Sequence, residues 1–62
     1  MYDYIKRSYP FQPEVGKRVR HTVINQEGVI AREDRGQGNY VQVKFDGRKF
    51  AVPCHPGELV YV

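Results

Sequence analysis

The sequence predicts an all-β fold, a small five-stranded barrel that follows an irregular N-terminal segment. Its hydrophobic runs are short and are broken by Gly, Pro, Asn and Asp, which is typical of strands and turns rather than of helices. Two alternating runs flank an Asp-Gly pair, a strong local signal for a hairpin. Turn residues also separate the other runs, at intervals that suit a small barrel. We therefore expect five short strands around one core.

The chain has 62 residues and is expected to form one domain. Its margin of stability should be thin, because chains of this size bury only about 60% of the surface that they expose when unfolded. Hydrophobic residues make up 40% of the chain, and five Tyr and three Phe supply enough apolar surface for one compact core. We place the barrel at residues 14–62 and a separate aromatic and basic segment at residues 1–13.

The N-terminal segment reads MYDYIKRSYPFQP, so that rings and cations are interleaved. Pro10 and Pro13 exclude a regular helix across its second half and favour extended geometry before each of them. Two interpretations are open. One is a flexible arm whose rings stack on bases while Lys6 and Arg7 contact phosphate. The other, which we favour, is a segment that lies across the barrel and covers an open end of its core, since small barrels need their ends covered.

The first strand is expected over residues 17–24. Val19 and Val23 alternate with Arg18 and Arg20, which predicts that the valines face the core and the arginines point outward. The residues that follow, Asn-Gln-Glu-Gly, supply a turn.

The second strand is expected over residues 27–33. Gly28 marks a bulge or a close backbone approach, and Ile30 needs cover of its own, which the N-terminal segment can give. Residues 34–39 then form a polar loop with two glycines, long enough to act as a recognition loop.

The third and fourth strands are expected to form a hairpin over residues 39–52, which read NYVQVKFDGRKFAV. A two-residue type I′ turn at Asp46-Gly47 would pair Val41 with Val52 and Lys44 with Lys49. Since side chains alternate along a strand, one face of this hairpin is apolar and the other is polar and basic. The apolar face would comprise Val41, Val43, Phe45, Phe50 and Val52. The polar face would comprise Tyr40, Gln42, Lys44, Lys49 and Ala51.

The chain ends with a tight connection at residues 53–57, expected to contain one turn of 3₁₀ helix, and a short closing strand at residues 59–62. No run approaches the roughly 20 apolar residues that a membrane span requires. No secretory signal is evident, and a single unpaired cysteine suits a reducing cytoplasm, where we expect the protein to act.

Metal binding and catalysis are not expected. His21, Cys54 and His55 provide at most three ligands, without the spacing of a structural zinc site. Cys54 and His55 are neighbours in the sequence, so on a strand they would point to opposite sides and could not act as nucleophile and base. The sequence therefore predicts no metal, no cofactor and no enzymatic activity.

Part of the sequence resembles known small barrels. The likeness covers residues 15–62 and lies in Gly16-Lys17-Arg18-Val19-Arg20-His21, Glu27-Gly28-Val29-Ile30, Val41-Gln42-Val43-Lys44-Phe45-Asp46-Gly47 and Leu59. This order is similar to an SH3-like (Tudor/KOW-type) barrel, in particular the C-terminal barrel of UvrD/PcrA-type helicases and the CarD-like RNA-polymerase-interaction domain. The resemblance implies a binding module that docks on RNA polymerase or nucleic acid, without catalysis. Short, basic, free-standing proteins of this kind also resemble uncharacterised prophage-encoded proteins of enteric bacteria.

A second resemblance points elsewhere. Val41-Gln42-Val43 is similar to the first three positions of the V-Q-I-Y strand of plasmid-borne type II dihydrofolate reductases. The tyrosine is missing, however, and the stretch precedes the Asp-Gly turn instead of the closing segment. We therefore do not expect reductase activity.

The predicted contact surface is the polar face of the hairpin. Opposed Lys44 and Lys49 would repel one another, and a bound phosphate would relieve that repulsion. Tyr40 and Gln42 would stack on and hydrogen-bond a base. Further residues that could extend this surface, although the sequence cannot place all of them on one side, are Arg18, Arg20, Arg32, Arg35 and Arg48. Ten Lys and Arg against seven Asp and Glu give a net charge of +3, which suits a polyanion partner without requiring one.

Two functions are open, and for the polar face of the hairpin a plain solvated face is the alternative. The first is a non-enzymatic module that binds DNA or RNA. The second is a module that docks on RNA polymerase or another host protein through an exposed strand edge or the N-terminal aromatic segment. Either would act as a monomer or a weak dimer. If acidic residues neutralise the arginines, the face is merely solvated.

Overall fold

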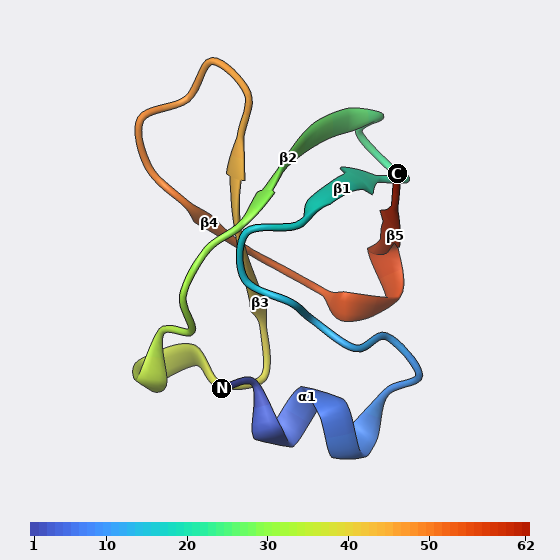
Figure 1. The fold of residues 1–62 in the computed structure, drawn as a ribbon, viewed down its shortest axis with the longest axis vertical. Coiled ribbons are helices and arrows are strands. Elements are labelled where there is room, and N and C mark those ends of the chain that lie inside the picture. Colours follow the sequence, from blue (N-terminus) through green and yellow to red (C-terminus); the bar gives the residue numbers. More distant parts are fainter.

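The computed structural model describes residues 1–62, the whole chain, and consists mostly of strands with one short helix (Figure 1). The strands form one antiparallel sheet in the order β4-β3-β2-β1-β5. In chain order, the elements are α1 (Asp3–Ser8), β1 (Arg18–His21), β2 (Gln26–Ile30), η1 (Arg35–Gln37), β3 (Val41–Phe45), β4 (Val52–Cys54), η2 (Pro56–Glu58) and β5 (Leu59–Tyr61). The prediction of an all-β fold with five strands is confirmed at this level.

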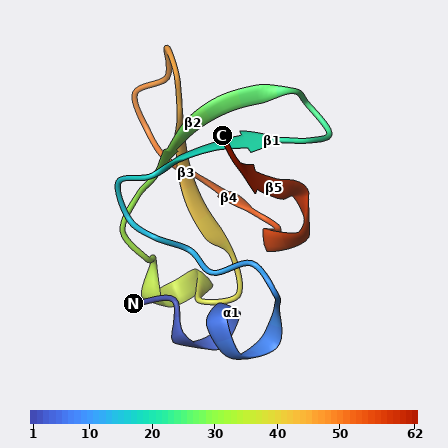
Figure 2. The ribbon, with the colours of Figure 1, turned by 45° about the vertical axis from the view of Figure 1, so that its right-hand side comes forward.

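The sheet curls strongly, so that the five strands enclose the core as a half-barrel (Figures 1 and 2). Strands β4 and β5 are its two edges. Helix α1 lies at one end of the curled sheet, and the loop between β3 and β4 projects at the other end. The structure contains no helix that is both long and apolar enough to cross a membrane.

The core draws on both the sheet and the N-terminal segment. Its buried members are Tyr2, Ile5, Val19, Ile30, Val41, Val43, Phe45, Cys54 and Leu59. Ile5, on the short helix, is completely buried, and Tyr2 immediately precedes that helix. The N-terminal segment therefore covers one end of the sheet, as the favoured interpretation predicts, and Ile30 belongs to the same buried cluster as Tyr2 and Ile5.

The prediction that this segment is irregular is wrong for residues 3–8, which form α1. Pro10 and Pro13 follow the helix, so they restrict the chain only after Ser8. Tyr2 anchors the helix with three hydrogen bonds. Its hydroxyl donates to the carbonyl of Ala31 at 2.7 Å and accepts the amide of Gln42 at 3.0 Å, while its own amide donates to a carboxylate at 2.8 Å.

Strand β1 is shorter than predicted. Val19 is buried and Arg18 is exposed, as expected, but Val23 is 71% exposed and lies in a turn. The turn forms because His21 ends the strand. Its Nδ1 accepts the amides of Val23 and Ile24 at 3.3 and 3.4 Å, and its carbonyl accepts the amide of Asn25 at 2.8 Å.

Gly28 marks a close backbone approach, as predicted. A Cβ atom at this position would lie 2.5 Å from the carbonyl oxygen of Lys44 and 2.7 Å from the Cα of Phe45. Only glycine therefore allows β2 and β3 to come this close.

The predicted register of the hairpin is wrong by two residues. Val43, not Val41, is paired with Val52, and Val41 is paired with Cys54. Residues 46–51 consequently form a loop instead of two strand ends joined by a two-residue turn. Lys44 and Lys49 are therefore not opposed.

A turn does occur at Asp46-Gly47, where the amide of Arg48 donates to the carbonyl of Phe45 at 3.1 Å. Gly47 alone has a positive φ, of 81°, whereas a type I′ turn needs positive φ at both central positions. The amide of Asp46 donates to the carbonyl of Glu27 at 3.0 Å, so β2, not β4, holds the base of the loop. Two residues predicted to face the core are exposed as a result, namely Phe50 and Val52.

The last connection contains the expected 3₁₀ turn, but at η2 rather than across residues 53–57. Pro53 and Cys54 instead belong to β4. The side chain of His55 caps η2, because its Nδ1 accepts the amide of Gly57 at 2.9 Å.

Candidate interaction surfaces

The predicted contact face does not form as one surface. Lys44 lies opposite Val29 of β2, and Lys49 lies in the loop that follows β3. Gln42 is only 6% exposed, and its side-chain Nε2 donates to Oε1 of Gln37 at 3.2 Å. Gln42 is thus covered by the loop that contains η1 and cannot reach a base. Tyr40 is 38% exposed at the start of β3.

Two of the predicted arginines are held by acidic residues. The guanidinium of Arg18 contacts both carboxylate oxygens of Asp46, at 2.6 and 3.3 Å, and lies 3.5 Å from Glu27. Arg20 lies 3.2 Å from Glu27. Hydrogen bonding to Arg18 lowers the pKa of the Asp46 carboxyl, so this carboxylate keeps its charge to lower pH. On the outer face of β1 and β2, positive and negative side chains therefore pair with one another. This pairing agrees with the alternative in which acidic residues neutralise the arginines.

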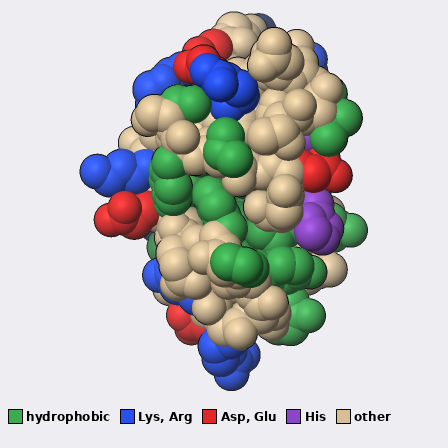
Figure 3. Space-filling view, turned by 90° about the vertical axis from the view of Figure 1, so that its right-hand side faces the viewer, with side chains coloured by type: hydrophobic (Ala, Val, Ile, Leu, Met, Phe, Trp, Pro, Cys, Tyr) green, Lys and Arg blue, Asp and Glu red, His purple; other side chains and the backbone are tan.

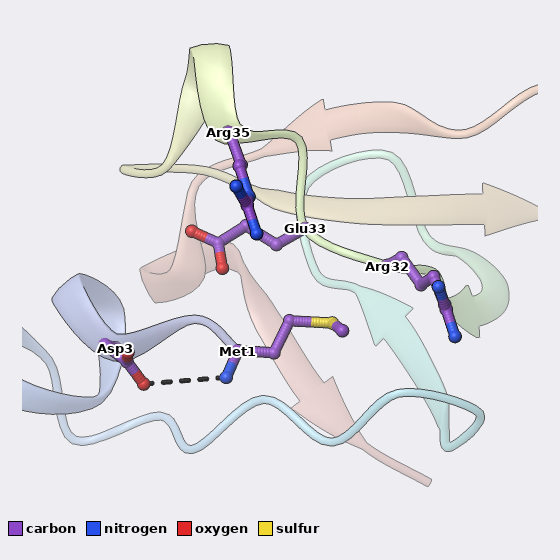
Figure 4. A pocket seen from close by; sticks show the side chains of 5 residues that line it. All are labelled: Met1, Asp3, Arg32, Glu33 and Arg35. Carbon is purple, nitrogen blue, oxygen red and sulfur yellow. Dashed lines mark ion pairs between the residues drawn. The ribbon is translucent and has the colours of Figure 1, made fainter.

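Arg35, in η1, lies near the N-terminus and lines a polar pocket of about 440 Å³ (Figure 4). Besides Arg35, the lining residues are Met1, Asp3, Arg32 and Glu33. The N-terminal amine lies 3.5 Å from the carboxylate of Asp3, and Glu33 accepts the amide of Tyr2. In Figure 4 the side chains of Arg35 and Glu33 overlap in projection without forming an ion pair, whereas Arg32 points away from both. Three cations, namely the N-terminal amine, Arg32 and Arg35, and two carboxylates line this pocket, so it carries both signs of charge and is not a purely cationic site.

An apolar groove of about 350 Å³ lies between the N-terminal segment and the last two elements of the chain. Its lining residues are Tyr9, Pro10, Phe11, Pro56, Gly57 and Leu59. The ring of Phe11 stacks on that of Tyr61 at 5.0 Å, and the ring of Tyr9 meets that of His55 edge-on at 5.3 Å. The groove therefore has aromatic walls that neighbouring rings hold in place.

The tyrosine beside this groove is also tied to the N-terminal segment. The hydroxyl of Tyr61 donates to the carbonyl of Gln12 at 2.7 Å. Partial burial raises the pKa of this hydroxyl, so it stays protonated and continues to donate. This bond fixes the distance between the segment and β5.

Strand β5 has an open edge next to the groove. The amide of Val62 donates to the carbonyl of Arg18 at 3.4 Å, and the carbonyl of Glu58 accepts the amide of Thr22 at 2.8 Å. Because hydrogen-bonding directions alternate along an antiparallel strand, the amide and carbonyl of Tyr61 point away from β1. The free backbone groups of Tyr61 therefore lie at the edge of the sheet.

Apolar side chains surround this edge. Val60 and Val62 are 44% and 56% exposed, and Ile24, in the turn after β1, is 50% exposed. Figure 3 looks at the side on which β5 lies in Figure 1. It shows hydrophobic side chains gathered across the middle of this face, with most charged side chains near its margins. Exposed apolar side chains therefore gather on the side of the molecule where β5 lies.

The residues considered for metal binding and nucleophilic chemistry have other contacts. The structure contains no group of three or more His, Cys, Asp or Glu placed to hold a metal ion. Burial raises the pKa of the Cys54 thiol to about 11, so the thiolate is scarce at neutral pH. His55 caps η2, and Nε2 of His21 lies 2.8 Å from the carboxylate of Glu58.

The groove was not predicted from the sequence, although the N-terminal aromatic segment that lines it was named as a contact candidate. The sequence signal that could have indicated this wall of the groove is the Tyr9-Pro10-Phe11 run, in which proline stiffens the chain between two rings. Its second wall, residues 56–59, is distant in the sequence, so local patterns could not show the two together. Comparisons with protein-family models, curated proteins and solved structures gave no match to this chain.

Proposed function

We propose that this chain is a non-enzymatic protein-binding module built on an SH3-like barrel. In this proposal, an extended segment of the partner adds a strand to β5 and places an apolar side chain in the neighbouring groove. The observation that carries the proposal is the open edge of β5 at Tyr61, directly beside a preformed apolar groove. Strand addition to an exposed edge, with a pocket that reads alternate side chains, is a common mode of peptide recognition.

The arrangement of the elements supports the SH3-like part of the proposal. The sheet order β4-β3-β2-β1-β5 combines a meander with a last strand that returns to pair with the first, and a 3₁₀ turn precedes that last strand. SH3-like barrels share this order of strands and this turn. The support is topological and carries no information on a ligand.

The contrast between the two sheet edges supports β5 as the binding edge. Strand β4 contains Pro53, which lacks an amide hydrogen and so blocks the addition of a further strand. Strand β5 contains neither proline nor a charged residue. Natural proteins usually protect exposed edges, so an unprotected apolar edge is typical of a pairing site.

The chemistry of the groove favours a protein over a nucleic acid at this surface. None of the six lining residues is charged, whereas nucleic-acid affinity depends mainly on cations that contact phosphates. A strand of three residues and one small groove bury little surface, so we expect a transient complex with a Kd on the order of 10 μM. RNA polymerase, the partner implied by the resemblance to CarD-like domains, is the first protein to test.

The proposal can be tested with peptides selected from a library of random linear sequences. We expect selected peptides to alternate apolar and polar residues. On titration into ¹⁵N-labelled protein, they should shift the amide signals of Tyr61 and Gly57. Purified RNA polymerase can be tested in parallel, in competition with such a peptide.

Two substitutions at one position separate the backbone contribution from that of the ring. Tyr61→Ala removes the ring and keeps the backbone N–H that faces the open edge. Tyr61→Pro removes both the ring and this N–H, and it breaks no hydrogen bond to β1, because the N–H of Tyr61 points away from β1. We expect Tyr61→Pro to abolish peptide binding and Tyr61→Ala to weaken it only in part. Equal binding by Tyr61→Pro and wild type, with both folded by NMR, would overturn the proposal, as would selected peptides that shift only residues far from β5.

A further inference from the structure

The loop at residues 46–51 forms a second surface, at the end of the molecule opposite α1. It leaves β3, projects beyond the curled sheet and returns to β4 (Figures 1 and 2). The apolar groove is lined by other residues, so this loop belongs to a different part of the surface. The loop exists because Val43, and not Val41, pairs with Val52, so that the register of β3 and β4 is shifted by two residues from that of a two-residue hairpin turn.

The loop is positively charged. Arg48 and Lys49 are exposed and form no ion pair. Asp46, the only acidic residue of the loop, is already bound by Arg18 at 2.6 Å. Lys44, at the base of the loop, is also exposed and is close enough to Asp46 to contribute to lowering the pKa of that carboxyl. Three cations without an ion-pair partner therefore lie on the loop and at its base.

The loop also carries the most exposed large hydrophobic side chain of the chain. Phe50 is 79% exposed and directly follows Lys49. Its ring faces water, although burial of a ring of this size would be favourable. An exposed aromatic ring among unpaired cations is the combination that binds single-stranded nucleic acid, in which rings stack on bases and cations contact the backbone.

We infer that this loop binds single-stranded nucleic acid. Phe50 stacks on an unpaired base, and Lys44, Arg48 and Lys49 contact the phosphates of neighbouring nucleotides. The ligand is single-stranded because the faces of bases in a duplex are already covered by stacking. Binding at this loop is independent of the peptide site that we propose at β5, and either can exist without the other.

Three phosphate contacts predict a modest salt dependence. Each contact on a single strand contributes a slope of about −0.7 in a plot of log K against log salt, so the expected slope is about −2. Fluorescence anisotropy with labelled oligo-dT and oligo-U measures this slope on the full chain. Binding of either oligonucleotide with this slope supports the inference, and the ratio of the two Kd values shows whether DNA or RNA is preferred.

The variant that tests stacking is Phe50→Ala, which we expect to weaken binding about tenfold, as loss of one stacked base predicts. Lys49→Gln should reduce the salt slope by about 0.7. The matched control is Lys6→Gln, which removes the same charge from α1, at the opposite end of the molecule, and should leave both quantities unchanged. All three side chains are exposed, so the variants should fold, and thermal unfolding monitors this.

Three results would overturn the inference. The first is no binding of either oligonucleotide at low salt. The second is an equal loss in Lys6→Gln and Lys49→Gln, which would indicate diffuse attraction by the net charge alone. The third is an interface with the selected peptides or with RNA polymerase at Phe50, which would assign the loop to a protein partner. If Phe50→Ala loses oligonucleotide binding while Tyr61→Pro retains it, the two sites are separate.

Discussion

The two ends of the curled sheet differ in how the chain completes them. At one end, α1 and Tyr2 close the core, and the buried polar groups there are paired. At the other end, the loop at residues 46–51 is held only at its base, and its tip exposes Phe50. We therefore expect the stability of this small domain to be concentrated at the closed end and at the base of the loop. The tip is free to serve binding. Substitutions at four positions between the two ends test this difference in stability.

The largest effect is expected at Tyr2. Tyr2→Ala removes a fully buried ring, which typically costs about 3–5 kcal/mol, a large part of the stability of so small a domain. Tyr2→Phe keeps the ring but leaves the carbonyl of Ala31 and the amide of Gln42 without their partner, at a cost of about 1–3 kcal/mol. Urea unfolding measures both values. Tyr4→Ala, on an exposed side chain of the same helix, is the control, and an equal loss there would contradict this difference in stability.

The next effect is expected at the base of the loop. Gly28→Ala would place a methyl group 2.5 Å from a carbonyl oxygen of β3, so the two strands must move apart. We expect a loss of about 1–3 kcal/mol, measured by urea unfolding. Gly36→Ala provides the comparison, because a methyl group there meets only an ordinary contact at 3.4 Å. Unchanged stability of Gly28→Ala would show that β2 and β3 are not held as close together as the structure indicates.

A smaller effect is expected at the ion pair that holds the loop. Arg18 lowers the pKa of the Asp46 carboxyl below its ordinary value of 3.8. The folded chain therefore gains stability above pH 3.8, and this gain is lost as the pH falls through the lower folded value. Asp46→Asn cannot titrate, so its stability should fall less steeply in acid than that of wild type. Identical acid unfolding curves at low salt would contradict this expectation, and added salt should shrink the difference.

The smallest effect is expected at the tip. Phe50→Ala should change stability by no more than about 0.5 kcal/mol, because the ring is 79% exposed. Thermal unfolding checks this value. A loss comparable to that of Tyr2→Phe would mean that the ring packs on the molecule and is not free to bind a ligand.

The sequence predicted the strands better than their pairing. Alternation correctly placed Val19 in the core and Arg18 outside it. It could not choose between registers that differ by two residues, because both place the same side chains on the same face. The choice depends on contacts of Asp46 with residues 19 and 28 positions away, which no local pattern contains.

The missed helix and the missed groove have the same cause. Ile5 is the only buried residue of α1, and Tyr2 lies just before the helix, so a stretch of only six residues carries almost no periodic signal. The groove is lined by Phe11 and Leu59, which are 48 positions apart in the sequence. Gln42, predicted to lie on the contact face, is covered by the loop that contains Gln37. In each case the deciding partner is distant in the sequence. The outward direction of Arg18 and Arg20 was predictable, whereas the side chains that cover one another were not.

The anchoring of Tyr2 has a consequence for cooperativity. A helix of six residues has almost no stability of its own in water, so α1 exists only while it is docked on the sheet. The sheet in turn loses part of its core when the helix leaves. Helical and strand signals should therefore vanish at the same denaturant concentration, and the whole chain behaves as one folding unit rather than as a barrel with an independent arm.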